Sequence, residues 1–343
     1  MARNFEEKIS PIMPTAKRRK TGRLPFPLDD LPDEIILKIF SFLNRKKLFL
    51  ASLVSKRMYN ISQDSSMFQR WLKINFFNKK LPTSLLEKVL LKGCKYLSLQ
   101  HATLEGNLRL EKRTLLKCLD ISNCRSNQGV KEQVLASCYS LEKLCLIESR
   151  LESINMNDLT AQNGQTLQIL NMINCKGLLD LDKMKPLIDN CVQLKELNLR
   201  DVRITKEAIA YLVTNLTPDI EGLSLSGLGH LIGDNEIKIL VSRCKNLSSL
   251  DLKHTGIGDD SLRAIIKNLQ ETLENLNVAD TSISSQSLEQ LDECQLLMIL
   301  KCDGDPWLSN GVEVNERGSY FTVASSAYKT FDLHSHSKGR RRR

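Results

Sequence analysis

Ten cysteines and five histidines are among the side chains of this 343-residue chain that could hold a metal ion or act in catalysis. Zinc sites use close ligand pairs, such as C-x-x-C with a second pair, and the sequence contains no such arrangement. The histidines also lack the spacing of a nucleophile with its base. We therefore expect no catalytic residues, no metal site and no cofactor, and a protein that is not itself an enzyme. The histidines are His101, His230, His254, His334 and His336.

A repeat with the pattern L-x-x-L-x-L, with conservative replacements, runs along most of the chain. Its first position recurs at spacings of 22 to 27 residues, within the period of about 20–29 residues of leucine-rich repeats. Alternating leucines, such as Leu197 and Leu199, point one side of a short strand into a core. The first positions are Cys94, Leu116, Leu141, Leu167, Leu194, Ile220, Leu247, Leu273 and Leu297.

A helical stripe precedes each strand by about ten residues, for example Ile237, Leu240, Val241 and Cys244 at i, i+3, i+4 and i+7. One strand–helix unit cannot bury its own apolar face, so neighbouring units must stack. The sequence thus predicts an α/β fold, a leucine-rich-repeat solenoid curved like a horseshoe, with a parallel sheet inside and helices outside. About nine repeats are expected over residues 94–305.

The register of the repeats also accounts for the positions of several cysteines. Cys138, Cys191, Cys244 and Cys294 stand three residues before the first position of a repeat, at the end of the helical stripe. Cysteine is a small and readily buried residue, so these side chains are predicted to fill the core.

The net charge of +9 belongs to the two ends of the chain. Residues 1–27 carry seven Lys/Arg against two Glu, and residues 310–343 carry seven Lys/Arg against three acids, so the region between them is formally neutral. A nucleic-acid-binding fold concentrates charge on its folded surface, so nucleic acid is not an expected partner. We expect a disordered basic tail at 1–27 and a C-terminal tail at 306–343.

A basic cluster in the first tail has the composition of a nuclear import signal, or is a solvated charge run. It predicts a protein of the nucleus and cytoplasm. No apolar run reaches the roughly 18–20 residues of a membrane span, so no membrane association is expected. The cluster consists of Lys17, Arg18, Arg19 and Lys20.

Residues 28–72 have a different texture, with three short predicted helices. Pro32 suits the first position of a helix whose apolar face contains Ile35, Ile36, Ile39, Phe40 and Leu43. A second helix is predicted at about 47–54 and a third from about residue 65 to residue 71. Such a small bundle is marginally stable alone.

This segment resembles an F-box. The resemblance is carried by the Leu31-Pro32-Asp33-Glu34 opening, the Ile-x-x-x-Ile-Phe spacing, the Val-Ser-Lys-Arg sequence at 54–57 and the aromatic pair Phe68 and Trp71. The order of F-box and leucine-rich repeats is similar to that of the S-phase kinase-associated F-box family, over about residues 28–302. Ser55 and Met58 depart from the family, which usually has Cys and Trp there.

The resemblance implies the substrate-recognition subunit of a Skp–cullin–F-box ubiquitin ligase. The F-box would bind the Skp adaptor and through it a cullin–RING ligase, and the repeats would bind a protein substrate for ubiquitination and proteasomal degradation, with or without an accessory substrate-presenting subunit. The implied adaptor contacts are Leu31, Pro32, Glu34, Ile35, Ile39, Phe40, Leu43, Leu48, Leu53, Val54 and Trp71.

Between the F-box and the repeats, residues 73–93 are predicted to form a rigid linker helix. Ser84-x-x-Glu87 resembles a capping box at its start.

Residues that alternate with the buried leucines face the concave surface of the predicted sheet. Four of them, Cys145, Ile147, Ile169 and Ile173, are apolar where a solvated surface is expected, and polar residues flank them. We expect this patch to bind substrate, unless the C-terminal tail or a shift of register covers it. The predicted substrate-binding residues are Lys143, Cys145, Ile147, Ile169, Asn171, Ile173, Glu196, Asn198 and Arg200.

Three alternatives remain at this point. The N-terminal helices could serve only as a cap for the solenoid. The repeats could form an interaction scaffold without coupling to a ligase. The basic tails could bind nucleic acid.

Overall fold

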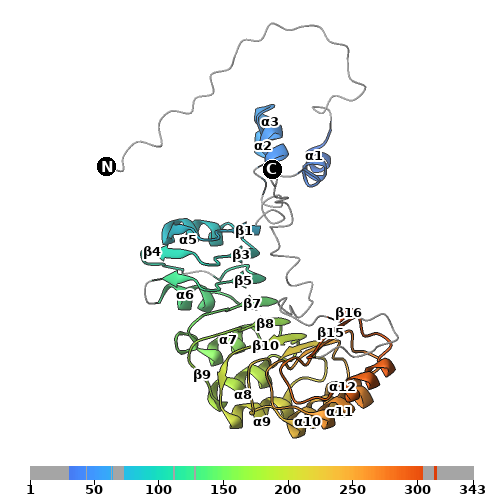
Figure 1. Cartoon of the computed structure of the whole chain (residues 1–343). Coiled ribbons are helices and arrows are strands. Elements are labelled where there is room, and N and C mark those ends of the chain that lie inside the picture. The colour runs from blue at the N-terminus through green and yellow to red at the C-terminus, as the bar shows by residue number, and fades with distance from the viewer. Residues whose placement is uncertain are drawn as a thin grey trace, which may run out of the picture. The chain divides into compact units, whose positions relative to one another are not determined.

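The computed structural model describes residues 31–43, 45–62, 64, 73–110, 113–126, 129–303 and 313–314. The chain divides into two compact units, residues 1–67 and residues 68–343 (Figure 1). Among the described residues no helix is long and apolar enough to cross a membrane.

The first unit contains three short helices, α1 (Asp33–Phe40), α2 (Arg45–Ser52) and α3 (Lys56–Ser62). The sequence does not predict α3, and the third helix that it does predict, at about 65–71, lies outside the described residues. Ser55 explains where α3 begins, because the hydroxyl of Ser55 accepts a hydrogen bond from the backbone N–H of Met58 at 3.1 Å. A serine in this relation to a helix is a favourable N-cap.

The core of this unit is small. Ile36 and Phe40 of α1 are buried together with Met58 and Ile61 of α3. Met58 is one of the two departures from the F-box pattern. Its side chain is buried in the interior of the unit and is therefore not available to contact a partner. An ion pair of 2.6 Å between the exposed Arg57 and Asp33 joins α3 to α1, but exposed pairs contribute little stability.

The second unit is built on a parallel sheet whose strands follow one another in chain order, eleven of them among the described residues. The middle leucines of successive strands pair in register, as Leu170, Leu197 and Leu223 do. Each of these leucines is almost fully buried. The strands are β1 (Lys73–Asn75), β3 (Tyr96–Ser98), β5 (Cys118–Asp120), β7 (Lys143–Cys145), β8 (Ile169–Asn171), β10 (Glu196–Asn198), β12 (Gly222–Ser224), β13 (Ser249–Asp251), β14 (Asn275–Asn277), β15 (Ile299–Lys301) and β16 (Glu313–Val314).

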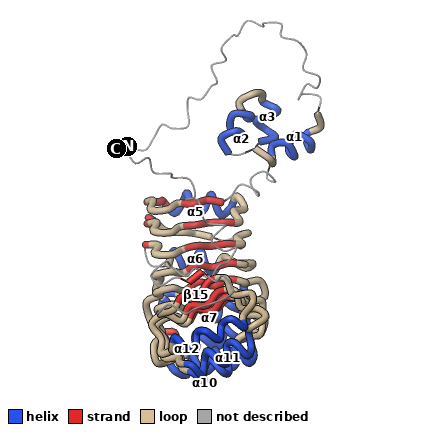
Figure 2. Tube along the Cα trace, turned by 45° about the vertical axis from the view of Figure 1, so that its right-hand side comes forward, coloured by secondary structure: helices blue, strands red, loops and turns tan. Residues whose placement is uncertain are grey.

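Helices line one side of this sheet, as Figure 2 shows in blue against the red strands. Buried stripes hold them to the core, for example Ile237, Leu240 and Val241 of α10. The predicted fold class, an α/β leucine-rich-repeat solenoid that follows a small all-helical module along the chain, is confirmed. The helices are α5 (Thr83–Leu91), α6 (Val130–Ala136), α7 (Met156–Asn163), α8 (Leu181–Asn190), α9 (Lys206–Asn215), α10 (Asp234–Arg243), α11 (Asp259–Leu269) and α12 (Ser285–Leu288), with the 3₁₀ helices η2 (Leu151–Ser153) and η3 (Glu289–Glu293).

Short outer strands connect some inner strands to their helices. They form two small parallel sheets, one of three strands and one of two. The outer strands are β2 (Lys80–Pro82), β4 (Thr103–Glu105), β6 (Arg125–Ser126), β9 (Leu178–Leu179) and β11 (Arg203–Ile204).

Residues 73–93 belong to the solenoid and are not a linker. Strand β1 pairs in parallel with β3, and helix α5 buries Leu86 and Leu90 in the same core as the repeats. The predicted helix is present, but Pro82 precedes it and no side chain caps it, so the predicted capping box is absent. A search for leucines misses this repeat because Ile74 and Phe76 pack against the core in place of leucines.

A residue with a left-handed backbone follows the inner strand in nine consecutive repeats, with φ between 46° and 78°. We call these residues the strand-exit row. In eight of them the backbone N–H donates to a carbonyl oxygen of the next repeat at 2.8–3.1 Å, so the turn joins the repeats to each other. Asn, Asp, His and Gly, which tolerate this conformation best, occupy most of the row. Its members are Asn78, His101, Asn123, Glu148, Asn174, Asp201, Gly227, His254 and Asp280.

The cysteines lie where the repeat register predicts. Cys138, Cys191, Cys244 and Cys294 expose at most 2 % of their surface, which confirms their place in the core. Burial raises the pKa of the Cys138 thiol to about 11. At neutral pH this side chain is therefore an apolar filler and not a nucleophilic thiolate.

Candidate protein-binding surfaces

The first candidate surface consists of the exposed apolar side chains of the helical unit. Among the predicted adaptor contacts, Ile35, Ile39, Leu53 and Val54 expose large apolar side chains, and Val54 exposes 73 %. Leu31, Leu43 and Leu48 are half-buried, and Pro32 and Glu34 are exposed. Trp71 lies outside the described residues.

Phe40 does not belong to this surface. It exposes only 4 %, because it stands one helical turn after Ile36, on the face of α1 that packs into the core. The adaptor contact expected at Phe40 is therefore wrong in this geometry.

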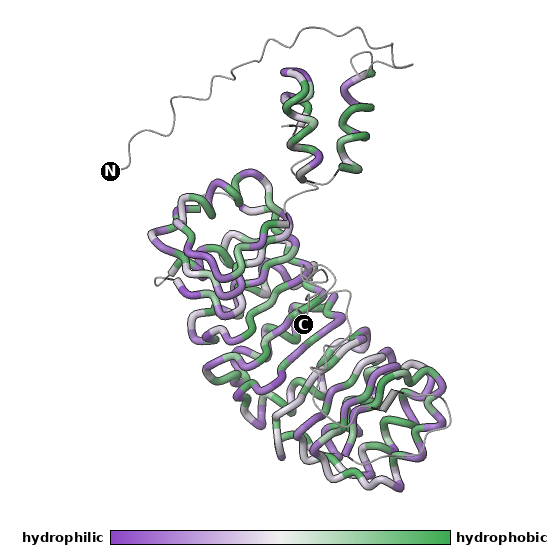
Figure 3. The backbone as a smooth tube through the Cα atoms, turned by 45° about the horizontal axis from the view of Figure 1, so that its top comes forward, coloured by the Kyte–Doolittle hydropathy of each residue, from purple (hydrophilic) through white to green (hydrophobic). Residues whose placement is uncertain are grey.

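Three exposed apolar side chains escape the sequence prediction, namely Phe42 at 78 %, Leu50 at 55 % and Tyr59 at 52 %. Helix α1 ends at Phe40, so the helical spacing that selects Leu43 no longer applies beyond that residue. Figure 3 shows how much of this small unit is apolar in sequence. Exposed apolar side chains gathered on so small a unit indicate a surface that binds another protein.

The second candidate surface is the concave face of the sheet. The predicted substrate-binding residues lie on three adjacent strands, β7, β8 and β10. The first residues of these strands, Lys143, Ile169 and Glu196, pair in register, and so do the third residues, Cys145, Asn171 and Asn198. The structure therefore brings the predicted residues together, while Ile147, Ile173 and Arg200 follow where the strands end.

The expected exposure of this patch is only partly present. Cys145 exposes 8 % and Lys143 exposes 5 %, whereas the three isoleucines are half-buried. Asn171 and Asn198 are buried because each turns back to its own chain, where its Oδ1 accepts a hydrogen bond from the backbone N–H two residues later. The alternation of side chains along a strand predicts which face of the sheet a side chain lies on, but not how much of it is exposed. The sequence prediction therefore expected more exposure than these side chains have.

Two groups of charged residues occupy the concave face. Burial lowers the pKa of Lys143, an effect that the nearby Cys145, Cys118, Glu196 and Asp120 oppose. Burial raises the pKa of Asp120. A partner that docks on this face must match charges that are already partly removed from water.

The second group lies toward the C-terminal repeats. Burial raises the pKa of Asp251 on β13, although hydrogen bonds and the neighbouring Arg200 and Lys301 oppose the shift. Burial also lowers the pKa of Lys301. The sequence prediction placed only Arg200 of this group in the binding surface; the other members alternate with buried leucines in the same way and could have been selected.

We expect Asp251→Asn to raise the free energy of unfolding at neutral pH. The folded-state pKa of Asp251 is raised, so the folded protein loses this proton less readily than the unfolded chain. Stability therefore falls as pH rises from the unfolded pKa through the folded pKa, and the loss persists at neutral pH. Asparagine does not titrate, and Asn198 and Asn277 already fill the equivalent place, each accepting the corresponding backbone N–H.

Urea denaturation between neutral pH and about pH 4 checks this expectation. The control is Asp234→Asn, which should lose stability at neutral pH. Burial alone would raise the pKa of Asp234, but hydrogen bonds from the Ser261 hydroxyl and from the backbone of Gly258 and Ser261 outweigh it and lower the pKa. A carboxylate with a lowered pKa stabilises the protein above its unfolded pKa, and this stability is lost as pH falls through the folded pKa. A gain for Asp251→Asn that does not shrink on acidification would contradict the interpretation.

A metal centre is not indicated in the part of the chain that the structure describes. There, no group of three or more His, Cys, Asp or Glu side chains is placed to hold an ion.

Comparison with known proteins finds a family model for each of two parts of the chain. The family model of the SKP2 LRR domain matches residues 84–304, and the F-box-like model matches residues 28–72. An Arabidopsis thaliana protein named as FBD-associated F-box protein is 35 % identical over 105 residues, which are 30 % of this chain and 21 % of the relative. The chain thus spans about a fifth of that relative's length.

A chain in the crystal structure of the yeast Rad7 and Elc1 complex is similar at 16 % sequence identity with a TM-score of 0.43, over 83 % of this chain and 93 % of that one. The family assignment rests on the two family models, because the repeat model alone covers more than half of the chain. The chain belongs to the F-box/leucine-rich-repeat family, with an F-box followed by a leucine-rich-repeat domain of the SKP2 type.

Proposed function

We propose that this protein is the substrate-recognition subunit of a Skp–cullin–F-box ubiquitin ligase. F-box and leucine-rich-repeat domains together support such a role in general. The observation that carries the proposal for this chain is the apolar surface of the helical unit, where Leu53, Val54 and Phe42 each expose at least 65 %. A mere cap for the solenoid would not need such a surface.

In this proposal the helical unit binds a Skp-type adaptor, and the adaptor connects the chain to a cullin–RING ligase. The exposed side chains of α1 and those between α2 and α3 supply the apolar contacts. Buried apolar anchors of this kind dominate the energetics of protein interfaces. Ubiquitin transfer belongs to the other subunits, so the chain acts by binding alone, as is typical of its family.

The concave face supplies substrate recognition. Its half-buried isoleucines, Ile147, Ile169 and Ile173, form an apolar centre beside the charged group around Lys143. An apolar centre with polar surroundings is the usual layout of a protein interface. The bound substrate would be ubiquitinated and degraded by the proteasome, with or without an accessory subunit. Nuclear entry through Lys17–Lys20 stays a prediction, because these residues lie outside the described part of the chain.

The test is co-purification of the full-length chain with a Skp adaptor and a cullin. We expect the wild type to retain both, and Leu53→Ser/Val54→Ser to weaken adaptor binding by about 100-fold or more, since two exposed anchors are removed. The matched control is Leu296→Ser/Met298→Ser, which changes the same chemistry at two side chains of the last repeats that expose 50 % and 56 %. The control should bind the adaptor like the wild type.

Failure of the wild type to retain the adaptor would remove the ligase proposal. The chain would then be an interaction scaffold of leucine-rich repeats without ligase coupling. Equal binding by the wild type and the Leu53→Ser/Val54→Ser variant would place the adaptor contact elsewhere.

A further inference from the structure

A row of basic side chains follows the outer side of the solenoid, where β4 and β9 lie to the left of the inner strands in Figure 1. Each of these residues stands two positions after a member of the strand-exit row, and all are exposed. In the first six repeats this position is a cation five times and threonine once, whereas in the last three it is glycine or serine. We call these cations the basic row. Its members are Lys80, Arg125, Arg150, Lys176 and Arg203.

The stacking of the repeats brings these charges close together. Thr103 pairs with Lys80 on one side and with Arg125 on the other, and Arg150 forms a bridge with Lys176. Neighbouring strands lie about 4.8 Å apart, so the six repeats span about 24 Å. Like charges directly opposite each other on neighbouring strands destabilise a sheet. The basic row therefore lowers the stability of the unbound protein, and an anionic partner would remove this repulsion.

Cations near the other end of the inner strands are neutralised differently. Just before these strands, Lys117 pairs with Glu142 of the next repeat, and Lys195 pairs with Glu221. In the described part of the chain, no side chain of the basic row makes an ion pair or a hydrogen bond of this kind. The five charges are therefore available to a partner.

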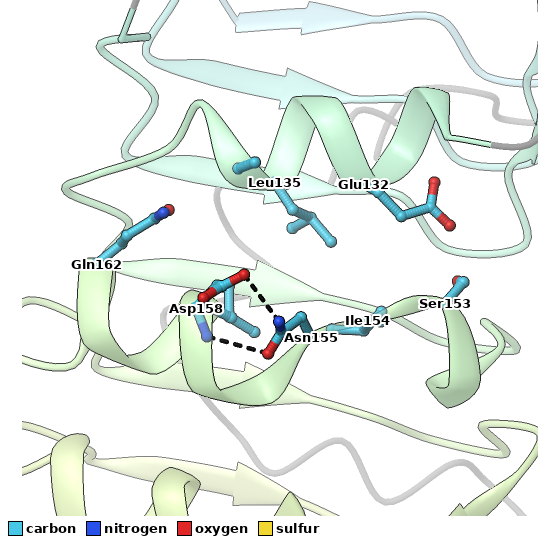
Figure 4. A pocket seen from close by; sticks show the side chains of 9 residues that line it. Glu132, Leu135, Ser153, Ile154, Asn155, Asp158 and Gln162 are labelled. Carbon is cyan, nitrogen blue, oxygen red and sulfur yellow. Dashed lines mark hydrogen bonds between the residues drawn. The ribbon is translucent and has the colours of Figure 1, made fainter.

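Acidic residues on the same segments do not cancel the row. Asp201 pairs with Arg200 at 3.1 Å, and Glu148 Oε2 accepts a hydrogen bond from Asn123 Nδ2 at 2.8 Å. On the helical layer beside the row, the pocket between α6 and α7 is lined by carboxylates and by no Lys or Arg (Figure 4). The positive charge is thus confined to the outer strands. The acids on the segments of the row are Glu105, Glu148, Glu152 and Asp201.

An exposed leucine lies within the basic row. Arg203 pairs in register with Leu178, two residues beyond Lys176. Leu178 exposes 43 % and the nearby Leu181 exposes 37 %. None of the five outer strands contains an aromatic residue, although surfaces that bind single-stranded nucleic acid stack bases on aromatic side chains. An apolar contact between cations fits a polypeptide better than a nucleic acid.

We propose that the basic row binds an acidic segment of a partner protein, which lies extended across the repeats and packs one apolar side chain on Leu178. An extended chain advances about 3.3–3.6 Å per residue, so about seven residues cover the row. The carboxylates of such a segment would pair with the cations that have no acidic neighbour. This surface is separate from the concave face, and the proposal does not depend on coupling to a ligase.

Fluorescence anisotropy with the full-length chain tests the proposal. The probe is a fluorescein-labelled heptapeptide with three glutamates on each side of one leucine, and the comparison probe has glutamine in place of every glutamate. At low ionic strength we expect saturable binding of the glutamate probe and at least about tenfold weaker binding of the glutamine probe. Lack of saturable binding, or equal binding of the two probes, would overturn the proposal.

Arg150→Glu/Lys176→Glu should weaken binding of the glutamate probe by at least about tenfold. The matched control is Lys185→Glu/Arg243→Glu, which changes the net charge equally at exposed residues of α8 and α10. Attraction to the basic ends of the chain is the same in both variants, so the control should bind within about twofold of the wild type. Equal weakening by both variants would overturn the proposal. So would tighter binding of a labelled oligodeoxythymidylate that only the first variant loses, because the row would then bind nucleic acid.

The apolar contact has its own test. Leu178→Ser should weaken binding of the leucine-containing probe by at least about threefold and leave binding of a heptaglutamate probe unchanged. Ile239→Ser, at a side chain of α10 that exposes 42 %, is the matched control and should bind both probes like the wild type. Equal binding of the leucine-containing probe by the wild type and Leu178→Ser would overturn the contact at Leu178.

Discussion

Replacing Gly164 with alanine is expected to lower the free energy of unfolding of the repeat unit by about 2–3 kcal/mol. A Cβ atom at this position would lie 2.4 Å from the carbonyl oxygen of Asn190 and 2.6 Å from that of Thr160. Both contacts are with backbone, which cannot rotate away as a side chain can. Gly164 has ordinary right-handed helical angles, φ −58° and ψ −31°, so space and not conformation requires glycine here.

Gly258→Ala is the matched control for this substitution. A Cβ atom at Gly258 meets nothing closer than 3.6 Å, and the expected loss is about 1 kcal/mol or less, the cost of alanine at a helix N-cap. Urea denaturation followed by circular dichroism measures both variants. If the two substitutions cost the same, the close approach of α7 to the end of α8 is not a constraint on the fold.

Replacing Asn163 with alanine should cost about 3 kcal/mol. Its side chain is fully buried. Oδ1 accepts a hydrogen bond from the backbone N–H of Leu141 at 2.9 Å, and Nδ2 donates to the carbonyl oxygens of Cys138 and Leu159 at 3.0 Å each. Alanine would leave backbone groups of the preceding repeat without hydrogen-bond partners in a buried site. An unsatisfied buried group costs more free energy than a hydrogen bond whose two groups can both turn to water.

Asn215→Ala provides the comparison, because Asn215 also ends its helix, α9. Its Nδ2 donates to the Tyr211 carbonyl oxygen at 3.0 Å, but the side chain is exposed and water can replace it. We expect a change within about 0.5 kcal/mol. Hydrogen exchange adds a local readout: in Asn163→Ala the Leu141 amide should exchange faster, and an unchanged exchange rate would contradict the role given to Asn163.

The repeats were predictable because each of them must bury one face of its strand and most of them do so with leucines at the same positions. The leucines that alternate in a strand, such as Leu197 and Leu199, must all reach one core, so their spacing reveals both strand and register. The repeat at residues 73–93 was not predicted because Ile74 and Phe76, and not leucines, pack against the core there. Helix α3 escaped because its start depends on one capping hydroxyl, at Ser55.

The binding surfaces were less predictable than the core. Whether an apolar side chain such as Phe40 or Ile35 faces a partner or the interior depends on how α1 packs, and both positions lie within a wide apolar stripe. On the concave face, the burial of Cys145 and Lys143 depends on neighbours from other repeats.

The strand-exit row has a consequence at the level of the gene. Codons for Asn, Asp and His differ from each other only in the first base, and Gly differs from Asp only in the second. One point mutation can therefore exchange residues that all tolerate the left-handed conformation, as at Asn174, Asp201, Gly227 and His254. Exchanges to or from Asp alter the charge along one rim of the sheet while the turn is kept. Drift at these codons gives descendants of this gene a route to new partners that leaves the stacking of repeats intact.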